Sequence, residues 1–303
     1  MKVTHNFPKR INTVVTTTTV LAALVVCTSA GRADLVYISN WNADTIDKLD
    51  SGGSYLGYYN SFHPRSIGLD SGGNLYVAEW GSQSIIKYTP SGVSSVFASG
   101  LQGVEGLTVD SGGNVYVTEL WDHNIMKFTP AGVGSVFGNT GNNDAYSLAF
   151  DSSGNLYVSE FNANRIEKFT APGVSSVFVT GLSSPYGLAF DNGGSLYVAN
   201  YGGHTIQKFA PGGGSSSIFA SGLTDPAGIA FDSTGNLYVA DEWALPNYGA
   251  VMRFTPGGVG SVFYSGAYSG PVSVAIRPVP EPSSMTLIGL AAGAVLALRK
   301  RFS

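Results

Sequence analysis

One pattern recurs about every forty residues and constrains the fold more than any other feature of the chain. Each copy has an apolar stretch ending in aspartate, a glycine-containing turn, and then Leu-Tyr-Val or Val-Tyr-Val. Two more short runs, rich in β-branched and aromatic residues, complete most copies. Such runs between Gly, Pro, Ser and Asp are typical of antiparallel strands. Four strands per forty residues predict a β-propeller blade. The five aspartates are Asp70, Asp110, Asp151, Asp191 and Asp232.

The number of blades follows from the two ends of the repeat region. Residues 35–39 match the second strand of the pattern, with no first strand before them, whereas residues 272–276 match a first strand that stands alone. We therefore expect the C-terminal strand to complete the first blade, which leaves no sheet edge open at the closure. The sequence predicts an all-β, six-bladed propeller over residues 34–278, closed by this C-terminal strand.

The first 33 residues have the parts of a secretory signal peptide. A basic start precedes an apolar stretch at residues 14–26, and small residues at positions 31 and 33 suit cleavage. The single cysteine, Cys27, lies inside this segment, where a lipoprotein anchor is the alternative interpretation. We expect the mature chain to contain no cysteine, and hence no disulfide and no thiolate metal site.

Residues 279–303 form another segment outside the repeats. Pro280, Glu281 and Pro282 are followed by an apolar run at residues 285–298 and by three basic residues. This segment resembles the PEP-CTERM sorting signal of Gram-negative bacteria, whose three parts occur in the same order. The resemblance implies export, anchoring in the membrane through the C-terminus, processing by an exosortase-type sorting enzyme, and a place at the cell surface or in the extracellular biofilm matrix. The alternative is an ordinary C-terminal transmembrane anchor helix.

The charges are distributed unevenly along the chain. The net charge is −4, but residues 34–279 contain nine Lys or Arg against nineteen Asp or Glu, because many cations lie in the terminal segments. A body this acidic lacks the positive surface that binding to phosphate backbones requires. Nucleic acid is therefore excluded as a partner.

Aromatic and acidic residues gather at two kinds of loop. In an antiparallel blade, the loop after the second strand and the loop that leads into the first strand lie on the same face. All four tryptophans follow second strands. The residues that we predict to share this face are Trp41, Glu79, Trp80, Glu119, Trp121, Glu160, Phe161, Tyr201, Asp241 and Trp243 after second strands, with Arg65, Glu105, Tyr146 and Tyr186 before first strands.

This face is predicted to bind a polysaccharide or another polar ligand. Sugar rings stack on aromatic side chains, and carboxylates accept hydrogen bonds from hydroxyl groups. In the structural alternative, the rings pack between blades and the acids bind neighbouring backbone.

The repeated aspartate turns, such as residues 70–74, also allow a functional and a structural interpretation. A ring of calcium loops would need several more oxygen ligands, so we predict that these aspartates accept hydrogen bonds from turn amides.

The repeat resembles the NHL family of six-bladed propellers, whose core is Gly-Leu-Ala-Phe-Asp followed by Gly-Asn-Leu-Tyr-Val-Ala. The likeness extends over nearly all of residues 34–276. It implies a fold and no particular chemistry, since propellers carry unrelated activities.

Two enzyme families with this architecture offer an alternative function. Virginiamycin B lyase and its relatives are similar around Glu79 and need a histidine near a metal-linked acid, for which His63 and Glu160 are the candidates. Calcium or another divalent cation is left open as a cofactor. The leading hypothesis is a non-enzymatic, exported binding propeller, and the alternative is a metal-dependent lyase or lactonase. In the gluconolactonase family, the metal-binding positions correspond to Arg65, Glu105, Tyr146, Tyr186, Ala227 and Val272, of which Glu105 alone could bind a metal.

Overall fold

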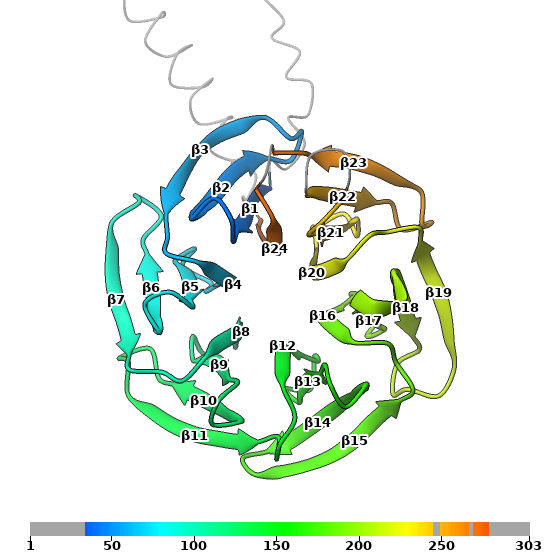
Figure 1. Ribbon diagram of the computed structural model, residues 1–303, viewed down its shortest axis with the longest axis horizontal. Coiled ribbons are helices and arrows are strands. Elements are labelled where there is room, and N and C mark those ends of the chain that lie inside the picture. The colour runs from blue at the N-terminus through cyan, green and yellow to red at the C-terminus, as the bar shows by residue number, and fades with distance from the viewer. Residues whose placement is uncertain (1–33, 245–248, 267–268, 279–303) are drawn as a thin grey trace, which may run out of the picture. The chain divides into compact units, whose positions relative to one another are not determined.

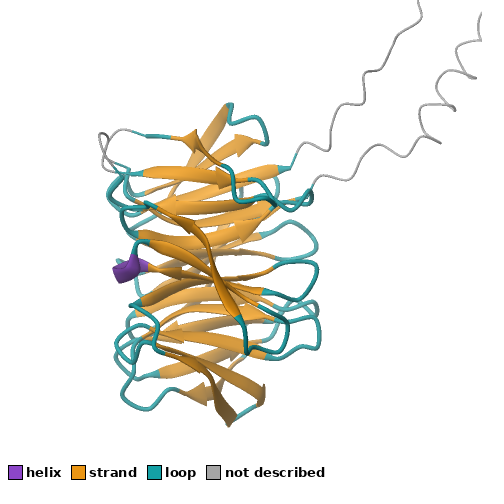
Figure 2. Cartoon of the chain, turned by 90° about the vertical axis from the view of Figure 1, so that its right-hand side faces the viewer, coloured by secondary structure: helices purple, strands orange, loops and turns teal. Residues whose placement is uncertain are grey.

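The computed structural model describes residues 34–244, 249–266 and 269–278. These residues form six four-stranded antiparallel sheets, arranged as blades around a central channel with the first strand of each blade innermost (Figure 1). Figure 2 shows the blades from the side, with loops at both faces. The one helical element in the described ranges is a short 3₁₀ turn, η1 (Tyr201–Gly203). The predicted all-β, six-bladed propeller is confirmed.

The strands follow the repeat closely. Blade 1 contains β24 (Pro271–Arg277), β1 (Leu35–Asn40), β2 (Thr45–Asp50) and β3 (Tyr55–Asn60). Blade 2 contains β4 (Pro64–Leu69), β5 (Leu75–Glu79), β6 (Ser84–Tyr88) and β7 (Ser94–Ser99), and blade 3 contains β8 (Val104–Val109), β9 (Val115–Glu119), β10 (Asn124–Phe128) and β11 (Gly134–Asn139). Blade 4 contains β12 (Ala145–Phe150), β13 (Leu156–Glu160), β14 (Arg165–Ala171) and β15 (Val174–Thr180). Blade 5 contains β16 (Pro185–Phe190), β17 (Leu196–Asn200), β18 (Thr205–Phe209) and β19 (Ser216–Ser221), and blade 6 contains β20 (Pro226–Phe231), β21 (Leu237–Asp241), β22 (Ala250–Phe254) and β23 (Gly260–Tyr264).

Strand β24 closes the ring. It pairs antiparallel with β1, with Leu35 opposite Arg277, so the innermost strand of blade 1 comes from the far end of the propeller sequence. The predicted closure by residues 272–276 is confirmed. Because the two strands are antiparallel, the described chain enters blade 1 at Asp34 and leaves it at Pro278 on one face. The loops after the second strands lie on the opposite face.

The core consists of six apolar clusters, each formed by two neighbouring blades. Second strands such as β5 are buried along their whole length, because neighbouring blades cover both of their faces. The tyrosine of each second strand enters one of these clusters. In blade 2, Tyr76 is 1% exposed and packs with Val104 and Leu107 of blade 3. The Leu-Tyr-Val pattern therefore supplies the contacts that join blade to blade.

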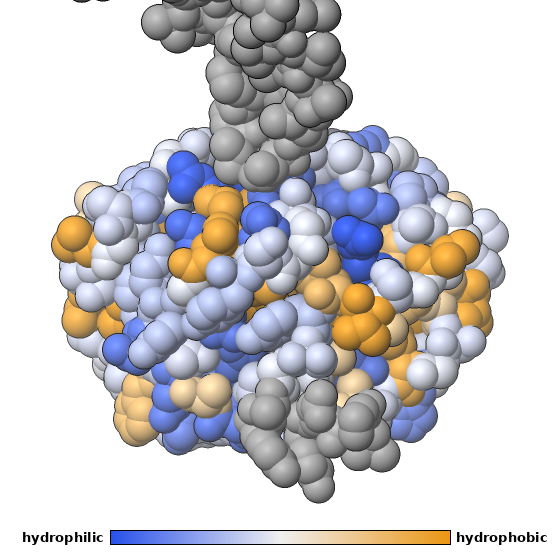
Figure 3. Space-filling view, turned by 90° about the horizontal axis from the view of Figure 1, so that it is seen from above, coloured by the Kyte–Doolittle hydropathy of each residue, from blue (hydrophilic) through white to orange (hydrophobic). Residues whose placement is uncertain are grey.

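The fourth strands form the outer edges of the blades and expose part of their apolar side chains. Val96, Val136 and Val262 are all more than half exposed. Figure 3 views the side where β3 and β23 lie, and apolar side chains there form separate small patches among polar ones. Scattered apolar residues of this kind are ordinary on a protein surface.

The repeated aspartates hold the turns between first and second strands. Asp70 Oδ1 accepts a hydrogen bond from the Asn74 backbone amide at 2.8 Å, and Oδ2 accepts one from the Asn74 side-chain amide at 2.7 Å. The same pair of bonds occurs at Asp110, Asp151 and Asp232. These bonds confirm the prediction that the aspartates accept turn amides.

The predicted signal peptide at residues 1–33 and the predicted sorting segment at residues 279–303, which includes Pro280, Glu281 and Pro282, lie outside the described residues. Within the described part of the chain, no helix has the length and apolar character needed to cross a membrane.

Candidate functional site

A β-bulge near the start of every innermost strand places one residue at the same end of the channel in each blade. In blade 2, Pro64 pairs with Glu79 and Ile67 with Val77, so two residues of β4 face a single residue of β5. A register shift occurs at this point in all six blades. Bulges re-aim side chains while the strand continues. The six residues at these bulges, which we call the mouth, are Arg65, Glu105, Tyr146, Tyr186, Ala227 and Val272.

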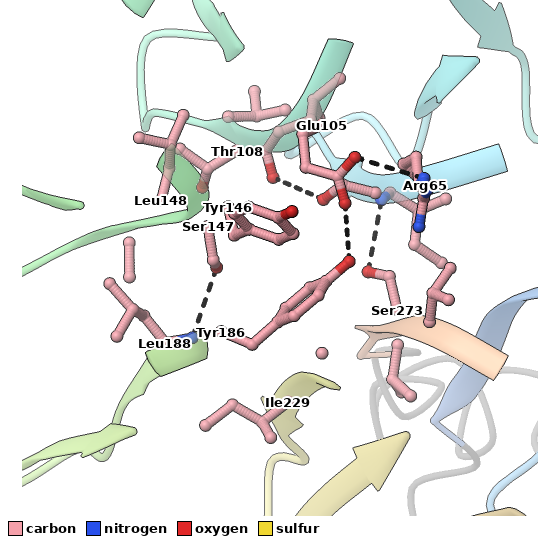
Figure 4. Close-up of a pocket in the computed structure, with 18 of the residues that line it drawn as sticks. Arg65, Glu105, Thr108, Tyr146, Ser147, Leu148, Tyr186, Leu188, Ile229 and Ser273 are labelled. Atoms are coloured by element: carbon pink, nitrogen blue, oxygen red, sulfur yellow. Dashed lines mark hydrogen bonds and ion pairs between the residues drawn. The ribbon is translucent and has the colours of Figure 1, made fainter. Parts of the chain in front are cut away.

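Three mouth residues form a bridge across the end of the channel. Arg65 Nε lies 3.2 Å from Glu105 Oε2, and the Tyr186 hydroxyl donates to Glu105 Oε1 at 2.7 Å (Figure 4). Glu105 belongs to blade 3 and Tyr186 to blade 5, so this hydrogen bond passes the innermost strand of blade 4. Glu105 is 2% exposed, and burial raises the pKa of its carboxyl although the Arg65 charge acts in the opposite direction.

The bridge lies at one end of a cavity of about 300 Å³ inside the channel. The hydroxyls of Ser66, Ser147 and Ser273 in its wall are hydrogen-bonded to backbone groups of neighbouring innermost strands (Figure 4). The innermost strands β16 and β20 also lie very close together. A Cβ atom added to Gly187 would lie 2.2 Å from the Ala227 carbonyl oxygen, which is too close for a side chain to fit. The three serine hydroxyls of the cavity wall are thus bonded within the protein, and Arg65 and Tyr146 are the two mouth residues that are partly exposed.

A second, outer ring of residues, which we call the rim, surrounds the mouth. The Arg65 guanidinium carbon lies 3.6 Å from the Trp41 ring centroid and 5.5 Å from that of Trp80, which is cation–π geometry. On blade 4, Phe161 stacks against Tyr146 at 4.5 Å between centroids. Aromatic side chains of the mouth and the rim thus contact each other in blade 4, and two tryptophans of the rim lie beside Arg65. The rim consists of the residues directly after the second strands, which are Trp41, Trp80, Leu120, Phe161, Tyr201 and Glu242.

Two further tryptophans extend this surface outward. Trp121 and Trp243 directly follow rim residues in the chain and are 57% and 41% exposed. Trp121 meets Trp80 edge to face at 5.6 Å between centroids. The structure thus brings the predicted aromatic residues together on one face.

Glu242 is the one acidic residue of the rim. It is 9% exposed, and the Tyr201 hydroxyl donates to its Oε2 at a long 3.4 Å. Burial raises the Glu242 pKa to about 7, while the Arg65 charge lowers it and the Glu105 charge raises it. The sequence prediction missed this residue. A usable signal existed, because the other blades have an aromatic residue or leucine at the same position of the repeat.

The acids at the ends of the second strands bind loop backbone. Glu79 Oε1 accepts the Phe62 amide at 3.0 Å, and Glu119 Oε1 accepts the Gln102 amide at 3.0 Å. Asp241 accepts two amides of the corresponding loop of blade 6. All three acids are less than 10% exposed. We call them the loop-binding acids; their contacts match the structural alternative, and their part in ligand binding stays a prediction.

The two candidate catalytic residues lie in different blades. Glu160 is 0% exposed and forms an ion pair with Arg165, and burial raises its pKa to about 7. His63 Nδ1 lies 2.7 Å from Asp44 Oδ1, and its ring packs against Trp41 at 4.7 Å between centroids. His63 precedes β4 of blade 2 and contacts Asp44, whereas Glu160 ends β13 of blade 4 and contacts Arg165. The structure does not bring the two together, and a catalytic role for either stays a prediction.

Comparison of the sequence with protein families finds two matches. The NHL repeat matches residues 182–209, which contain the first three strands of blade 5. The PEP-CTERM protein-sorting motif matches residues 278–301. The chain is therefore a six-bladed propeller with an NHL-repeat match in blade 5 and a PEP-CTERM motif at residues 278–301. No curated protein sequence is significantly similar to it.

Solved structures of quite different proteins resemble this propeller. A nidogen/laminin complex superposes with a TM-score of 0.72 at 18% identity, covering 80% of this chain and 98% of the other. A streptogramin B lyase gives 0.64 at 17%, covering 80% and 87%. A gluconolactonase from Xanthomonas campestris gives 0.63 at 15%, covering 82% and 97%. At these identities the likeness establishes the fold alone.

The mouth of the propeller does not fit a metal ion. Glu105 is its single acid, and the carboxylate already faces the Arg65 guanidinium and the Tyr186 hydroxyl. Calcium takes roughly six to eight oxygen ligands, and zinc a compact set of nitrogen, sulfur or oxygen donors. In the described ranges, no three His, Cys, Asp or Glu side chains are grouped closely enough to share an ion.

The loop-binding acids lead to a first testable prediction. We expect Glu119→Ala to lower the free energy of unfolding by about 1–3 kcal/mol, because the Gln102 amide loses its acceptor. Urea unfolding followed by circular dichroism measures the change. Asp122→Asn, which removes an exposed charge on the same face, is the control and should stay within about 0.5 kcal/mol. Equal stability of Glu119→Ala and the parent would contradict a structural role for this acid.

Proposed function

We propose that this exported propeller is a binding protein, anchored at the cell envelope or released into the matrix, that recognises extracellular polysaccharide or another polar ligand. The observation that carries the proposal is the convergence of the aromatic rim with Arg65, Glu105 and Glu242 at one end of the channel. Small-ligand sites typically combine apolar and aromatic surface with a few oriented polar groups.

The chemistry of a sugar suits such a surface. One side of a pyranose ring is largely apolar and stacks on aromatic faces, while its edge carries hydroxyl groups that need donors and acceptors. The exposed rings of Trp121 and Trp243 supply the first kind of contact. The guanidinium of Arg65, which is 22% exposed, and the carboxylate of Glu242 supply the second. The loop-binding acids hold the loops in place and so favour a preformed site.

The proposal includes the route by which the protein reaches its ligand. The sorting motif indicates export. We propose that residues 1–33 are a signal peptide, residues 34–278 the propeller, and residues 279–303 a sorting segment that anchors the chain in the membrane. An exosortase-type enzyme is the proposed partner that processes this segment.

A glycan array probed with the full chain in detergent, with and without calcium, tests the proposal. Once a ligand is identified, Trp121→Ala combined with Trp243→Ala should weaken its binding by about tenfold or more, because each stacking contact is worth about 0.5–1.5 kcal/mol. The fold should persist, since both rings are exposed. Tyr58→Ala is the matched control, because Tyr58 is 56% exposed on β3 and lies away from the mouth. Equal affinity of the double variant and the parent would reject this face as the site.

A further inference from the structure

The mouth and rim contain more acid than base. Glu105 and Arg65 form an ion pair, so the single mouth cation is already opposed by a carboxylate. Glu242 is a second buried carboxylate at the same opening, and the hydrogen bond from Tyr201 at 3.4 Å is long. Among the described residues, no ion pair with Lys, Arg or His includes Glu242. The Arg65 charge acts on Glu242 from a distance but forms no ion pair with it, so this buried carboxylate is compensated only in part, which favours a cationic partner.

The surroundings of Glu242 suit an ammonium group. Tyr201, which donates to Glu242, stacks on Tyr186 at 5.9 Å and meets Phe161 at the same distance between centroids. Aromatic faces attract ammonium groups, and a carboxylate accepts their hydrogen bonds. An ammonium also has only three donors to satisfy, so one carboxylate and neighbouring oxygens suffice where a metal ion would need more ligands.

We propose that Glu242 binds the ammonium group of an amino sugar, so that the ligand of the mouth and rim is a polysaccharide containing de-N-acetylated residues. This inference rests on the proposed binding function. An amino sugar is favoured over a lysine side chain because Trp243, which follows Glu242 in the chain and is 41% exposed, offers a flat surface for a pyranose ring. The burial that raises the Glu242 pKa to about 7 is consistent with a carboxylate that gains from a cationic partner.

Calorimetric titration of the full chain in detergent with four short probes tests the proposal. The probes are the β-1,4-linked tetramers of glucosamine, N-acetylglucosamine and glucose, together with tetralysine. We expect the glucosamine tetramer to bind at least about tenfold more tightly than the N-acetylated tetramer, which has the same backbone and no charge. In Glu242→Gln this preference should fall to within twofold, whereas Asp122→Asn should keep it. Glu242→Asp keeps the charge and provides a second variant, in which part of the preference should persist.

The outcomes separate the two proposals. Equal binding of the glucosamine and N-acetylglucosamine tetramers would overturn the ammonium inference and leave a polysaccharide-binding function standing. Tetralysine binding as tightly as the glucosamine tetramer would overturn the assignment to sugars. Absence of binding to all four probes, together with a blank glycan array, would reject both proposals. A preference for glucosamine that survives in Glu242→Gln would place the ammonium elsewhere and overturn the assignment to Glu242.

Discussion

Removal of residues 271–303 is expected to abolish the cooperative unfolding transition of the propeller. This truncation deletes β24, whose Val272, Val274 and Ala275 are all less than 10% exposed, and it leaves β1 without its inner neighbour. Val274 and Ala275 also belong to the clusters that join blade 1 to both of its neighbours. We expect a loss of more than about 5 kcal/mol, which is comparable with the whole stability of an ordinary domain.

Thermal unfolding monitored by circular dichroism measures this effect. Removal of residues 279–303 alone is the matched control, because it spares every strand of the ring, and it should leave the melting temperature nearly unchanged. A cooperative transition within a few degrees of the control in the longer truncation would show that the ring closes without β24.

Replacement of Arg65 by methionine is expected to destabilise the propeller by about 3–5 kcal/mol at pH 8, because it leaves the Glu105 carboxylate buried without its cation. The loss should be smaller at pH 5. Burial already raises the pKa of Glu105, and the Arg65 charge opposes this rise, so the variant raises the pKa further. A carboxyl with a raised pKa contributes stability that is fully present below its ordinary pKa and is lost as the pH rises through the raised value.

Urea unfolding at pH 5 and pH 8 measures how much stability the Arg65→Met variant loses and whether the loss is larger at the higher pH. The double variant Arg65→Met with Glu105→Gln removes the buried charge and keeps an acceptor for the Tyr186 hydroxyl, so it should recover most of the loss at pH 8. A pH-independent loss in the single variant would mean that packing of Arg65 against Trp41, and not its charge, provides the stability.

The fold could be predicted because each blade repeats the same signals. An apolar strand, an aspartate turn and a buried Leu-Tyr-Val run recur often enough to count the blades, and the unpaired pattern at residues 272–276 predicted the closure. The bulge could not be predicted in the same way. It depends on how β4 and its equivalents pair with the neighbouring strands. The residues at the bulges also share no common type, since residue 65 is basic and residue 105 is acidic although both occupy the same position of the repeat.

The site was harder to predict because residues that hold loops and residues that could contact a ligand occupy neighbouring positions of the repeat. Glu79, Glu119 and Asp241 looked like ligand contacts, yet the same position is Asn40 in blade 1 and Asn200 in blade 5. A position that accepts either acid or amide suits an acceptor for backbone amides, and the loop contacts of these acids agree with that role. Glu242 is the opposite case, because the other blades have an aromatic residue or leucine at its position, and this departure from the repeat is a signal in the sequence of a role other than folding.

Both ends of the ring leave from the face opposite the mouth, and the PEP-CTERM match begins at residue 278, directly after β24. If the proposed sorting segment tethers the chain, it holds each copy next to its closing strand, on the face opposite the aromatic residues. Copies attached side by side in this way would present an array of openings. One long polymer could then engage several copies at once, so that weak individual contacts would add up to durable adhesion.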